Sequence, residues 1–233
     1  MSNWLESPFF GILLTLLAFE IGLFLQRKTK LLICNPLLLA IVFVILFLII
    51  TKIDVSIYQR GGDIINMFLG PATVVLAVPL YKQLHSLKNY FLPIIFGVFI
   101  GSLAGMLSII ICSILMQFEP AIIASLLPKS VTTPIGIEIS AQLGGIPSIT
   151  VLNILITGIL GTIIAEVVFK IFHIQDPVAK GIAIGTSSHA VGTSKALQLG
   201  HIEGAMSSLA IGVAGLMTVF LAPWIWSILL PLL

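Results

Sequence analysis

The feature that most constrains the fold of this chain is its long apolar runs, which contain almost no charged residues. Lys, Arg, Asp and Glu make up 9% of its 233 residues, while 58% are hydrophobic. A soluble domain carries about 25% charged residues, so this chain has too few charges to cover a water-exposed surface. The runs are continuous, unlike the short alternating strands of a membrane barrel. The sequence therefore predicts a polytopic all-α membrane protein and excludes a soluble enzyme, a nucleic-acid binder and a disordered chain.

The apolar runs have the length of membrane-spanning helices. A span takes about 20 residues, so the chain has room for about seven to eight transmembrane segments with short loops. The runs are Phe9–Leu25, Leu31–Thr51, Ile64–Leu80, Tyr90–Leu115, Ile149–Phe172, Val178–Leu199 and Ala205–Leu232. Residues 1–7 contain no Lys or Arg, unlike a cleavable signal peptide, so the first run is expected to remain as a helix.

Two polar segments interrupt this apolar pattern. Residues 121–147 hold two apolar pieces, each shorter than a span, on either side of a polar stretch at residues 128–134. The run Val178–Leu199 is interrupted by small and hydroxyl residues at 185–195. Broken helices at membrane depth are tolerated only where protein or a watery cavity surrounds the freed backbone groups. Both segments therefore indicate a site.

An internal repeat is suggested by a shift of 115 residues. This shift places Ile64–Leu80 on Val178–Leu199, with Gly70 on Gly185. Interrupted segments at corresponding positions of two halves are typical of a transporter site. We therefore predict two repeats: residues 1–116 form the first, with four helices, 117–147 form a broken, re-entrant segment that opens the second, and 148–233 form its remainder.

The basic residues predict the orientation of the halves. Arg27, Lys28 and Lys30 are placed in the cytoplasm by the positive-inside rule. A middle segment that dips into the membrane and returns keeps Lys170 and Lys180 on that side as well. The third run then descends while the seventh ascends, so the repeats are inverted and their discontinuous helices meet near the midplane. The N-terminus is expected outside, and His173 and the C-terminus inside.

The polar stretch at 128–134 is the first candidate binding segment. It offers Lys129 with the hydroxyls of Ser130, Thr132 and Thr133. Ser or Thr ahead of a helix that starts with Pro134 is an N-cap arrangement, and the free N–H groups of such a helix start suit a carboxylate. The alternative is a surface loop with an ordinary cap.

The segment at 185–195 is the second candidate. Its polar side chains are Thr186, Ser187, Ser188, His189 and Thr193. The alternative is close helix packing, which small residues allow in membranes. A histidine inside a span is costly unless it is partnered or functional, so His189 is a candidate for proton coupling or for contact with an anion.

Two further residues complete the candidate set. Glu138 follows the Pro134 break by one turn, so it is a candidate for proton coupling or for pairing with Lys129. Thr73 lies in the matching break of the first half and can add a hydroxyl to the site, although helix packing is an equal alternative. Cys34 and Cys112 lie inside apolar runs and are expected to be structural.

Catalytic and cofactor motifs are missing from the sequence. It contains no Ser-His-Asp, metal-ligand or phosphate-loop arrangement, so we expect neither an enzyme nor a cofactor or metal site. The glycines of Gly97–Gly105 recur every four residues, which indicates helix packing rather than nucleotide binding. The net charge of +2 is too small and too scattered to indicate a nucleic-acid partner.

The interrupted segments resemble those of the LrgB/CidB family, and the resemblance covers nearly the whole chain. The matching stretches are Phe68–Thr73, Ala77–Lys82, Leu127–Pro134 and Gly185–His189. This resemblance implies a multi-pass protein of the bacterial cytoplasmic membrane that works beside a small membrane partner of the LrgA/CidA type. It also implies two activities. One is antiholin-like or holin-like control of murein hydrolases and autolysis, and the other is transport of small monocarboxylates.

Together, the residues and the resemblance favour a carrier of small monocarboxylates. The resemblance suggests pyruvate in bacteria and glycolate or glycerate in the plastid relatives. In this interpretation, hydroxyls and helix N-termini hold the carboxylate, and control of autolysis is linked to transport. The alternative is an antiholin-like or holin-like regulator of murein hydrolases and lysis that moves no solute. A homo-oligomer is compatible with either function.

Overall fold

The computed structural model describes residues 6–29, 36–68 and 90–232, together with 71, 74, 78, 81 and 88. All regular structure in these residues is helical, as the sequence predicts. The chain divides into two compact units, residues 1–72 and residues 73–233. Thr73 and most of the run Ile64–Leu80 lie outside the described residues, so the repeat with a shift of 115 residues stays a prediction, as does the division into three parts.

The described residues of the first unit form three helices, α2 (Pro8–Thr29), α3 (Pro36–Thr51) and α4 (Val55–Asn66). Their core is a small apolar cluster made of Leu14, Ala18, Ala40, Val44 and Leu48. Helix α2 packs closely on α4, since a Cβ placed on Gly11 would lie 3.0 Å from the Cα of Gly61. Helix α4 occupies a polar stretch that no apolar run predicted; Asp54 caps it by accepting a hydrogen bond from the Ser56 N–H at 2.8 Å.

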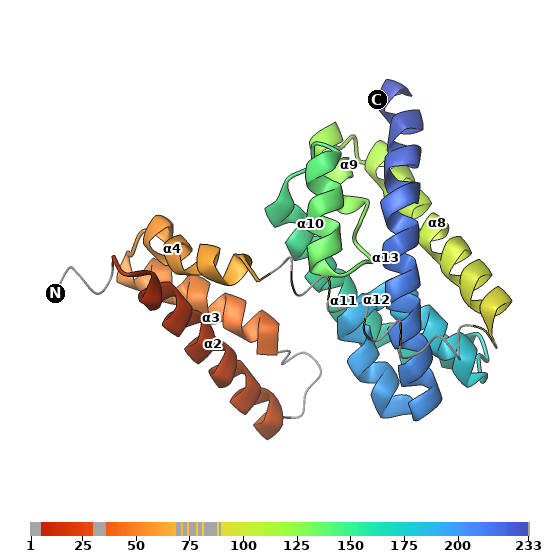
Figure 1. The fold of residues 1–233 in the computed structure, drawn as a ribbon, viewed down its shortest axis with the longest axis horizontal. Coiled ribbons are helices and arrows are strands. Elements are labelled where there is room, and N and C mark those ends of the chain that lie inside the picture. The colour runs from red at the N-terminus through yellow and green to blue at the C-terminus, as the bar shows by residue number, and fades with distance from the viewer. Residues whose placement is uncertain are drawn as a thin grey trace. The chain divides into compact units, whose positions relative to one another are not determined.

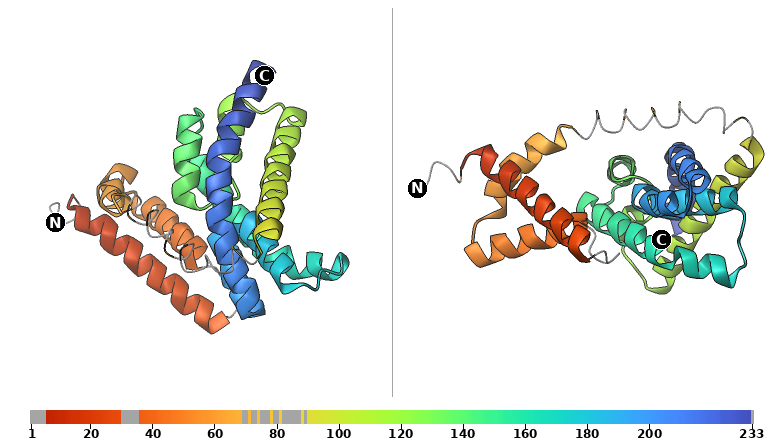
Figure 2. Two further views of the ribbon diagram at one scale, coloured as in Figure 1. Left: turned by 45° about the vertical axis from the view of Figure 1, so that its right-hand side comes forward. Right: turned by 90° about the horizontal axis from the view of Figure 1, so that it is seen from below.

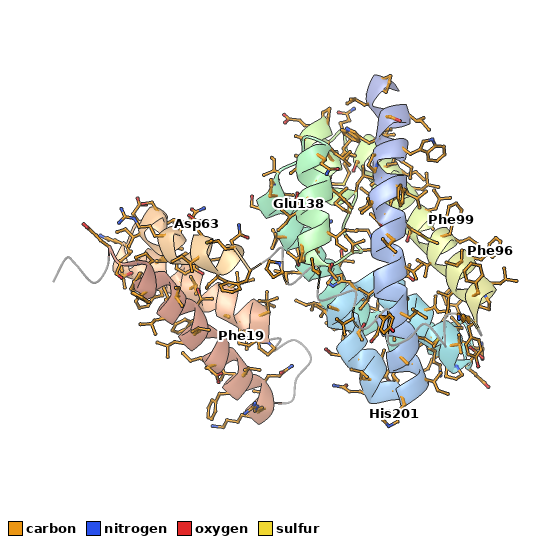
Figure 3. All side chains as sticks on the ribbon, in the orientation of Figure 1. Phe19, Asp63, Phe96, Phe99, Glu138 and His201 are labelled. Atoms are coloured by element: carbon orange, nitrogen blue, oxygen red, sulfur yellow. The ribbon has the colours of Figure 1, made fainter. Side chains whose placement is uncertain are left out.

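The second unit contains three long helices, α8 (Phe91–Leu115), α11 (Pro147–Ile171) and α13 (His201–Leu229) (Figure 1). The 3₁₀ turn η1 (Leu230–Leu232) follows α13. These three helices and α2 are each long and apolar enough to cross a membrane. Side chains such as Phe96 and Phe99 project outward from α8, as a lipid-facing surface requires (Figure 3). The described chain is therefore that of a multi-pass membrane protein.

The long helices differ in direction. Helices α8 and α13 run parallel, because Ile94 near the start of α8 packs with Leu209, whereas Ile110 near its end packs with Ile225. Helix α13 passes along the whole unit from its first turn to the C-terminus (Figures 1 and 2). Helix α11 runs the opposite way, since Phe169 near its end packs beside α12 (Pro177–Leu199), which leads into the start of α13.

Two short helices, α9 (Pro120–Leu126) and α10 (Thr133–Gln142), form a hairpin between α8 and α11. We call this the first hairpin and its turn, residues 127–132, the first tip. Buried hydroxyls hold the hairpin to α11: Thr150 Oγ1 donates to Ser140 Oγ at 2.7 Å, and Ser125 Oγ accepts from the Ile146 N–H at 2.7 Å. The chain thus runs from the end of α8 through α9, turns at the first tip and returns through α10 to the start of α11.

Helix α12 does not cross the unit but folds back at His189, where the backbone leaves the helical conformation with φ 41° and ψ −139°. Its two arms lie at the same level, because Gly185 packs on Ser207 and Thr193 Oγ1 lies 2.7 Å from Ser207 Oγ. Nearer the ends of the arms, Gly181 and Leu197 both pack beside the first turn of α13. We call the two arms the second hairpin and residues 186–190 the second tip.

This second hairpin corrects the predicted topology. From the sequence, the run Val178–Leu199 is predicted to be a crossing segment that ascends, with the C-terminus inside. Because α12 returns to the end of the unit from which it came, α13 crosses in its place. The C-terminus therefore lies at the opposite end from His173, and the prediction that both share one side was wrong.

The two ends of the second unit differ in charge. Lys170 and Lys180 lie at the end where α11 stops and α12 starts, which we call the basic end. Residues 116–122, 143–146 and 225–232, which belong to the other end, contain no Lys or Arg. The positive-inside rule places the basic end in the cytoplasm.

The second unit also contains a structural repeat. Helices α8 and α11 each have 25 residues and start 56 positions apart, at Phe91 and Pro147. Both end in the same turn, with a positive φ of 55° at Gln117 and 53° at His173. Each then leads into a hairpin that starts with proline. Because α8 and α11 run in opposite directions, the two hairpins enter the unit from opposite ends.

Candidate functional site

The two tips meet near the middle of the second unit. A small cavity between them is lined by Ser130 and Val131 of the first tip, Thr186 of the second tip, and Ser102 and Thr218, close to the midpoints of α8 and α13. The structure thus brings together the two interrupted segments that the sequence analysis singled out. In a membrane, these residues lie near the centre of the bilayer.

The first tip interrupts the helix at prolines and hydroxyl residues. Helix α9 ends before Pro128, and Pro134 stands at the start of α10. Thr132 is the N-cap residue of α10, as predicted, but its side chain makes no capping hydrogen bond, and its buried Oγ1 has no partner among the described residues. Thr133 is half-buried in the first turn of α10.

The second tip is held by the side chain of His189. This side chain is buried, and its Nε2 lies 2.9 Å from the carbonyl oxygen of Ile154 in α11. Nε2 must donate this hydrogen bond, because a carbonyl oxygen only accepts. Thr193 Oγ1 donates to the His189 carbonyl at 3.0 Å. These bonds support a backbone conformation that costs a residue other than glycine about 1–3 kcal/mol.

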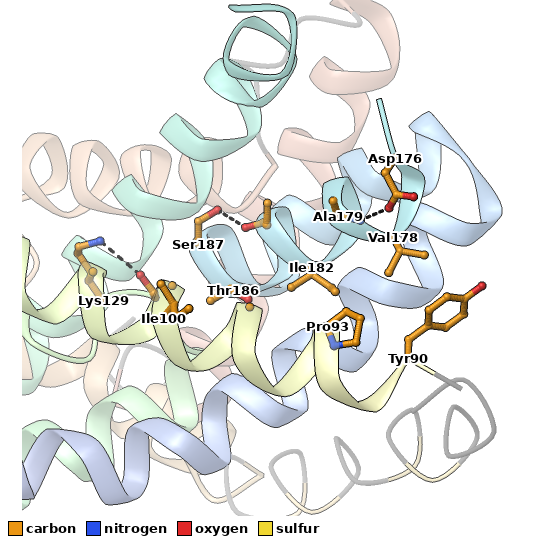
Figure 4. Close-up of a pocket in the computed structure, with 15 residues that line it drawn as sticks. Tyr90, Pro93, Ile100, Lys129, Asp176, Val178, Ala179, Ile182, Thr186 and Ser187 are labelled. Carbon is orange, nitrogen blue, oxygen red and sulfur yellow. Dashed lines mark hydrogen bonds between the residues drawn. The ribbon is translucent and has the colours of Figure 1, made fainter. Parts of the chain in front are cut away.

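A cavity of about 710 Å³ extends from the tips towards the basic end (Figure 4). Lys129 and Ser130 line it from the first tip, and Thr186 and Ser187 from the second. Its walls are one face of α8 and the first arm of α12. At the far end of the cavity lie Tyr90, Asp176 and Val178.

Lys129 is the cation of this site. Its Nζ donates to Ser130 Oγ at 3.3 Å, and the residue is half-buried. It also lines a second cavity of about 490 Å³ on the other side of α12, together with Ser187 and Ser188. Among the described residues, no carboxylate forms an ion pair with Lys129. Glu138, proposed as its partner, is exposed on α10 (Figure 3) and does not pair with it.

One ion pair is present between described residues, and it joins α11 to the second hairpin. Lys195 on the second arm of α12 pairs with Glu166 of α11. The Lys195 side chain is 14% exposed and that of Glu166 is 42% exposed. This pair cannot be predicted from the sequence, because an offset of 29 positions between two helices gives no local signal. The contact fixes the second arm against α11.

Ser188 and Thr193, two further candidate residues of the second segment, differ in whether they line a cavity. Ser188 lines the cavity of about 490 Å³, while Thr193 bonds to α13 and lines neither cavity.

The residues of α8 that form a wall of the larger cavity were not among the candidates predicted from the sequence. Their signal was the glycine spacing: a Cβ on Gly97 would lie 3.2 Å from Ile182 Cγ2, and one on Gly101 would lie 2.9 Å from Thr186 Cγ2. The glycine face therefore packs closely on α12 and also borders the cavity.

The fold and site define a polytopic α-helical membrane protein in which two re-entrant hairpins from opposite ends meet at a cavity near mid-depth. The model of the LrgB-like family matches residues 15–228, and the chain belongs to this family. It is 37% identical over 218 residues to the antiholin-like protein LrgB of Bacillus subtilis (strain 168), covering 93% of this chain and 94% of that protein. It is also 35% identical over 218 residues to the antiholin-like protein LrgB of Bacillus cereus (strain B4264), with 93% and 95% covered. No solved structure matches the chain.

These relatives confirm the family predicted from the interrupted segments. With the apolar helices, they make the chain a multi-pass bacterial membrane protein. Membership of this family points to a membrane protein without enzymatic activity.

Proposed function

We propose that this protein carries small monocarboxylates, such as pyruvate or glycolate, across the bacterial cytoplasmic membrane. The observation that carries the proposal is Lys129, a cation without an acidic partner in the described chain, at a cavity where two broken helices meet. A charge inside a membrane is costly and marks a substrate or ion pathway by default. A substrate carboxylate would supply the missing partner.

The chemistry of the cavity favours a small substrate with one negative charge. Lys129 is the cation among its lining residues, and Ser130, Thr186 and Ser187 offer hydroxyl hydrogen bonds to carboxylate or hydroxyl oxygens. The wall opposite consists of apolar groups and glycines of α8. A second carboxylate on the substrate would have no cation to pair with and would pay the cost of an unpaired buried charge. Monocarboxylates are therefore favoured over dicarboxylates.

The position of the cavity supports a route from the cytoplasm. It reaches from the tips to Tyr90 and Asp176 at the basic end. Towards the other end, a buried apolar cluster closes the unit, with Met106, Ile123 and Trp226 among its members. Transport would require the first hairpin to move away from this cluster, so that the same site opens to the outside. The inverted arrangement of the two hairpins suits such an exchange.

The second candidate function is that of an antiholin-like regulator. Both Bacillus relatives carry that description, and it supports a role of this chain in the control of murein hydrolases and lysis. Such a protein would act with a small LrgA/CidA-type membrane partner and need not move a solute. The two functions are compatible if autolysis responds to carboxylate flux.

Uptake of radiolabelled pyruvate into proteoliposomes tests the proposal. We expect saturable uptake by the purified chain, measured with and without the small LrgA/CidA-type partner. Glycolate should compete, and a dicarboxylate such as succinate should compete at least about tenfold less well, because one unpaired buried charge costs more than 1.4 kcal/mol. If folded protein gives no uptake above empty vesicles in either condition, the regulator without transport is the better account.

A further inference from the structure

The small cavity between the two tips is distinct from the two large ones. Its volume of about 10 Å³ has room for about one water molecule or one small ion. Four hydroxyl residues from four different elements line it: Ser102 of α8, Ser130 of the first tip, Thr186 of the second tip and Thr218 of α13. The remaining lining residues are apolar or glycine, so every side-chain polar atom here is a hydroxyl oxygen.

Thr186 contributes a buried hydroxyl without a partner to this cavity. Its side chain is 5% exposed, and its Oγ1 has no hydrogen-bond partner in the described part of the chain. Buried hydroxyls in proteins are almost always bonded. An oxygen-binding species in the cavity would satisfy Thr186 and would contact Ser102 and Thr218 from the other walls.

The helix ends around the cavity favour a cation. Leu127 and Pro128, which line it, follow directly on the C-terminal end of α9. Thr186 lies in the last turn of the first arm of α12, which ends at the break at His189. The C-terminal end of a helix presents free carbonyl groups and a partial negative charge. Two such ends therefore converge on the hydroxyl oxygens, and in broken membrane helices such ends coordinate Na⁺.

The absence of acids from the lining limits the charge of the ion. Sites for Ca²⁺ and Mg²⁺ in proteins use carboxylates, and none lines this cavity among the described residues. Neutral oxygens suit an ion of one charge, and the small volume suits Na⁺ better than the larger K⁺. We propose that Ser102, Ser130, Thr186 and Thr218 form a binding site for one Na⁺ ion.

Ser130 connects this site to the larger cavity, because it lines both and also accepts the hydrogen bond from Lys129 Nζ. A Na⁺ ion here would lie close to the Lys129 ammonium group and be repelled by it. A carboxylate bound at Lys129 would offset that repulsion, so each ligand should raise the affinity of the other. This coupling rests on the proposed carrier function, whereas the Na⁺ site itself does not.

Thermal unfolding of the purified full-length protein tests the site without any transport. At constant ionic strength, NaCl replaces choline chloride, and the unfolding midpoint is followed from about 1 to 100 mM Na⁺. A ligand that binds only the folded state raises the midpoint, here by roughly 5 °C if the dissociation constant is near 1 mM. KCl should give a smaller rise. Thr186→Val keeps the volume and should abolish the Na⁺ response.

Thr162→Val is the matched control. Thr162 lies on α11, away from the cavity, and its Oγ1 bonds to the Gly158 carbonyl at 2.7 Å within its own helix. This variant should keep the full Na⁺ response. If Thr186→Val does not fold, Thr218→Val on α13 provides the same test. Equal midpoints in NaCl and choline chloride, or a Na⁺ response that survives in the cavity variants, would overturn the site and leave a single water as its occupant. Either result is independent of whether pyruvate uptake is found.

Discussion

The imidazole Nε2 of His189 lies 2.9 Å from the carbonyl oxygen of Ile154 and joins the break in α12 to the first half of α11. Nε2 must carry a proton to make this hydrogen bond, because the carbonyl oxygen only accepts. The imidazole ring is buried. From the sequence, His189 is a candidate for proton coupling or for contact with an anion. Since the side chain lines neither of the two large cavities, we now infer that it positions the second tip.

This positioning role predicts the behaviour of two variants. His189→Gln keeps a donor and should retain folding and the pH profile of uptake. His189→Leu removes the hydrogen bond to the Ile154 carbonyl, which keeps its partner within α11, and should destabilise the protein by about 0.5–1.5 kcal/mol, as measured by thermal unfolding in detergent. A pH profile that flattens in His189→Gln, at normal stability, would instead support a proton-carrying role.

The fold of the second hairpin predicts the side of the membrane on which each loop lies. A reporter inserted after His173 should report the cytoplasm, and one fused after the C-terminal residue should report the outside. The reason is that α12 returns at His189, so α13 is the segment that crosses. A cytoplasmic signal from both fusions would mean that α12 crosses as a straight helix, and the hairpin would then be wrong.

The ion pair between Glu166 and Lys195 predicts a coupling between α11 and the second arm of α12. Glu166→Gln and Lys195→Gln should each lower stability, and the double variant should lose less than the sum of the two. Residues in contact typically show an interaction energy of about 0.5–3 kcal/mol in such a cycle. The value here should lie near the lower limit, because Glu166 is 42% exposed. Strict additivity of the three unfolding measurements would show that the pair is not formed.

The hydroxyl groups of Ser187 and Thr132, one in each tip, should differ in function. Ser187 lines both large cavities, whereas Thr132 is buried and lines none of the cavities described. Ser187→Ala should therefore raise the KM for pyruvate by about three- to tenfold, the worth of one hydrogen bond. Thr132→Val should leave KM unchanged. The reverse order of effects would place the substrate at the start of α10 rather than between the tips.

The sequence predicts the broken helices well and their path poorly. The prolines around Lys129 and the polar residues around His189 identify both interruptions, because such residues are incompatible with lipid-exposed helix. Hydropathy does not distinguish a straight helix from one that folds back, and Val178–Leu199 is long enough to span the membrane. The path of α12 is fixed by contacts with α13, such as that of Thr193 with Ser207, which have no local signature.

The structural repeat of α8 and α11 could not be predicted from the sequence, for a related reason. Its two copies share helix length and the positive φ at Gln117 and His173 but few side chains. Backbone geometry of this kind leaves too few identities for a sequence shift to detect. The placement of Thr186 between two cavities likewise depends on how α8 packs on α12.

The central claim is that a carboxylate binds between the two tips, on a path open to the basic end. Ser187→Cys, in a chain whose Cys34 and Cys112 are replaced by alanine, allows a direct measurement with a membrane-impermeant thiol reagent. We predict that the reagent labels this cysteine from the cytoplasmic side of oriented vesicles and that pyruvate slows the labelling, whereas the same concentration of chloride does not. Pyruvate protection should disappear when Lys129→Gln is added and persist with the exposed control Lys28→Gln. Labelling at one rate with and without pyruvate, in protein that folds normally, would contradict the account.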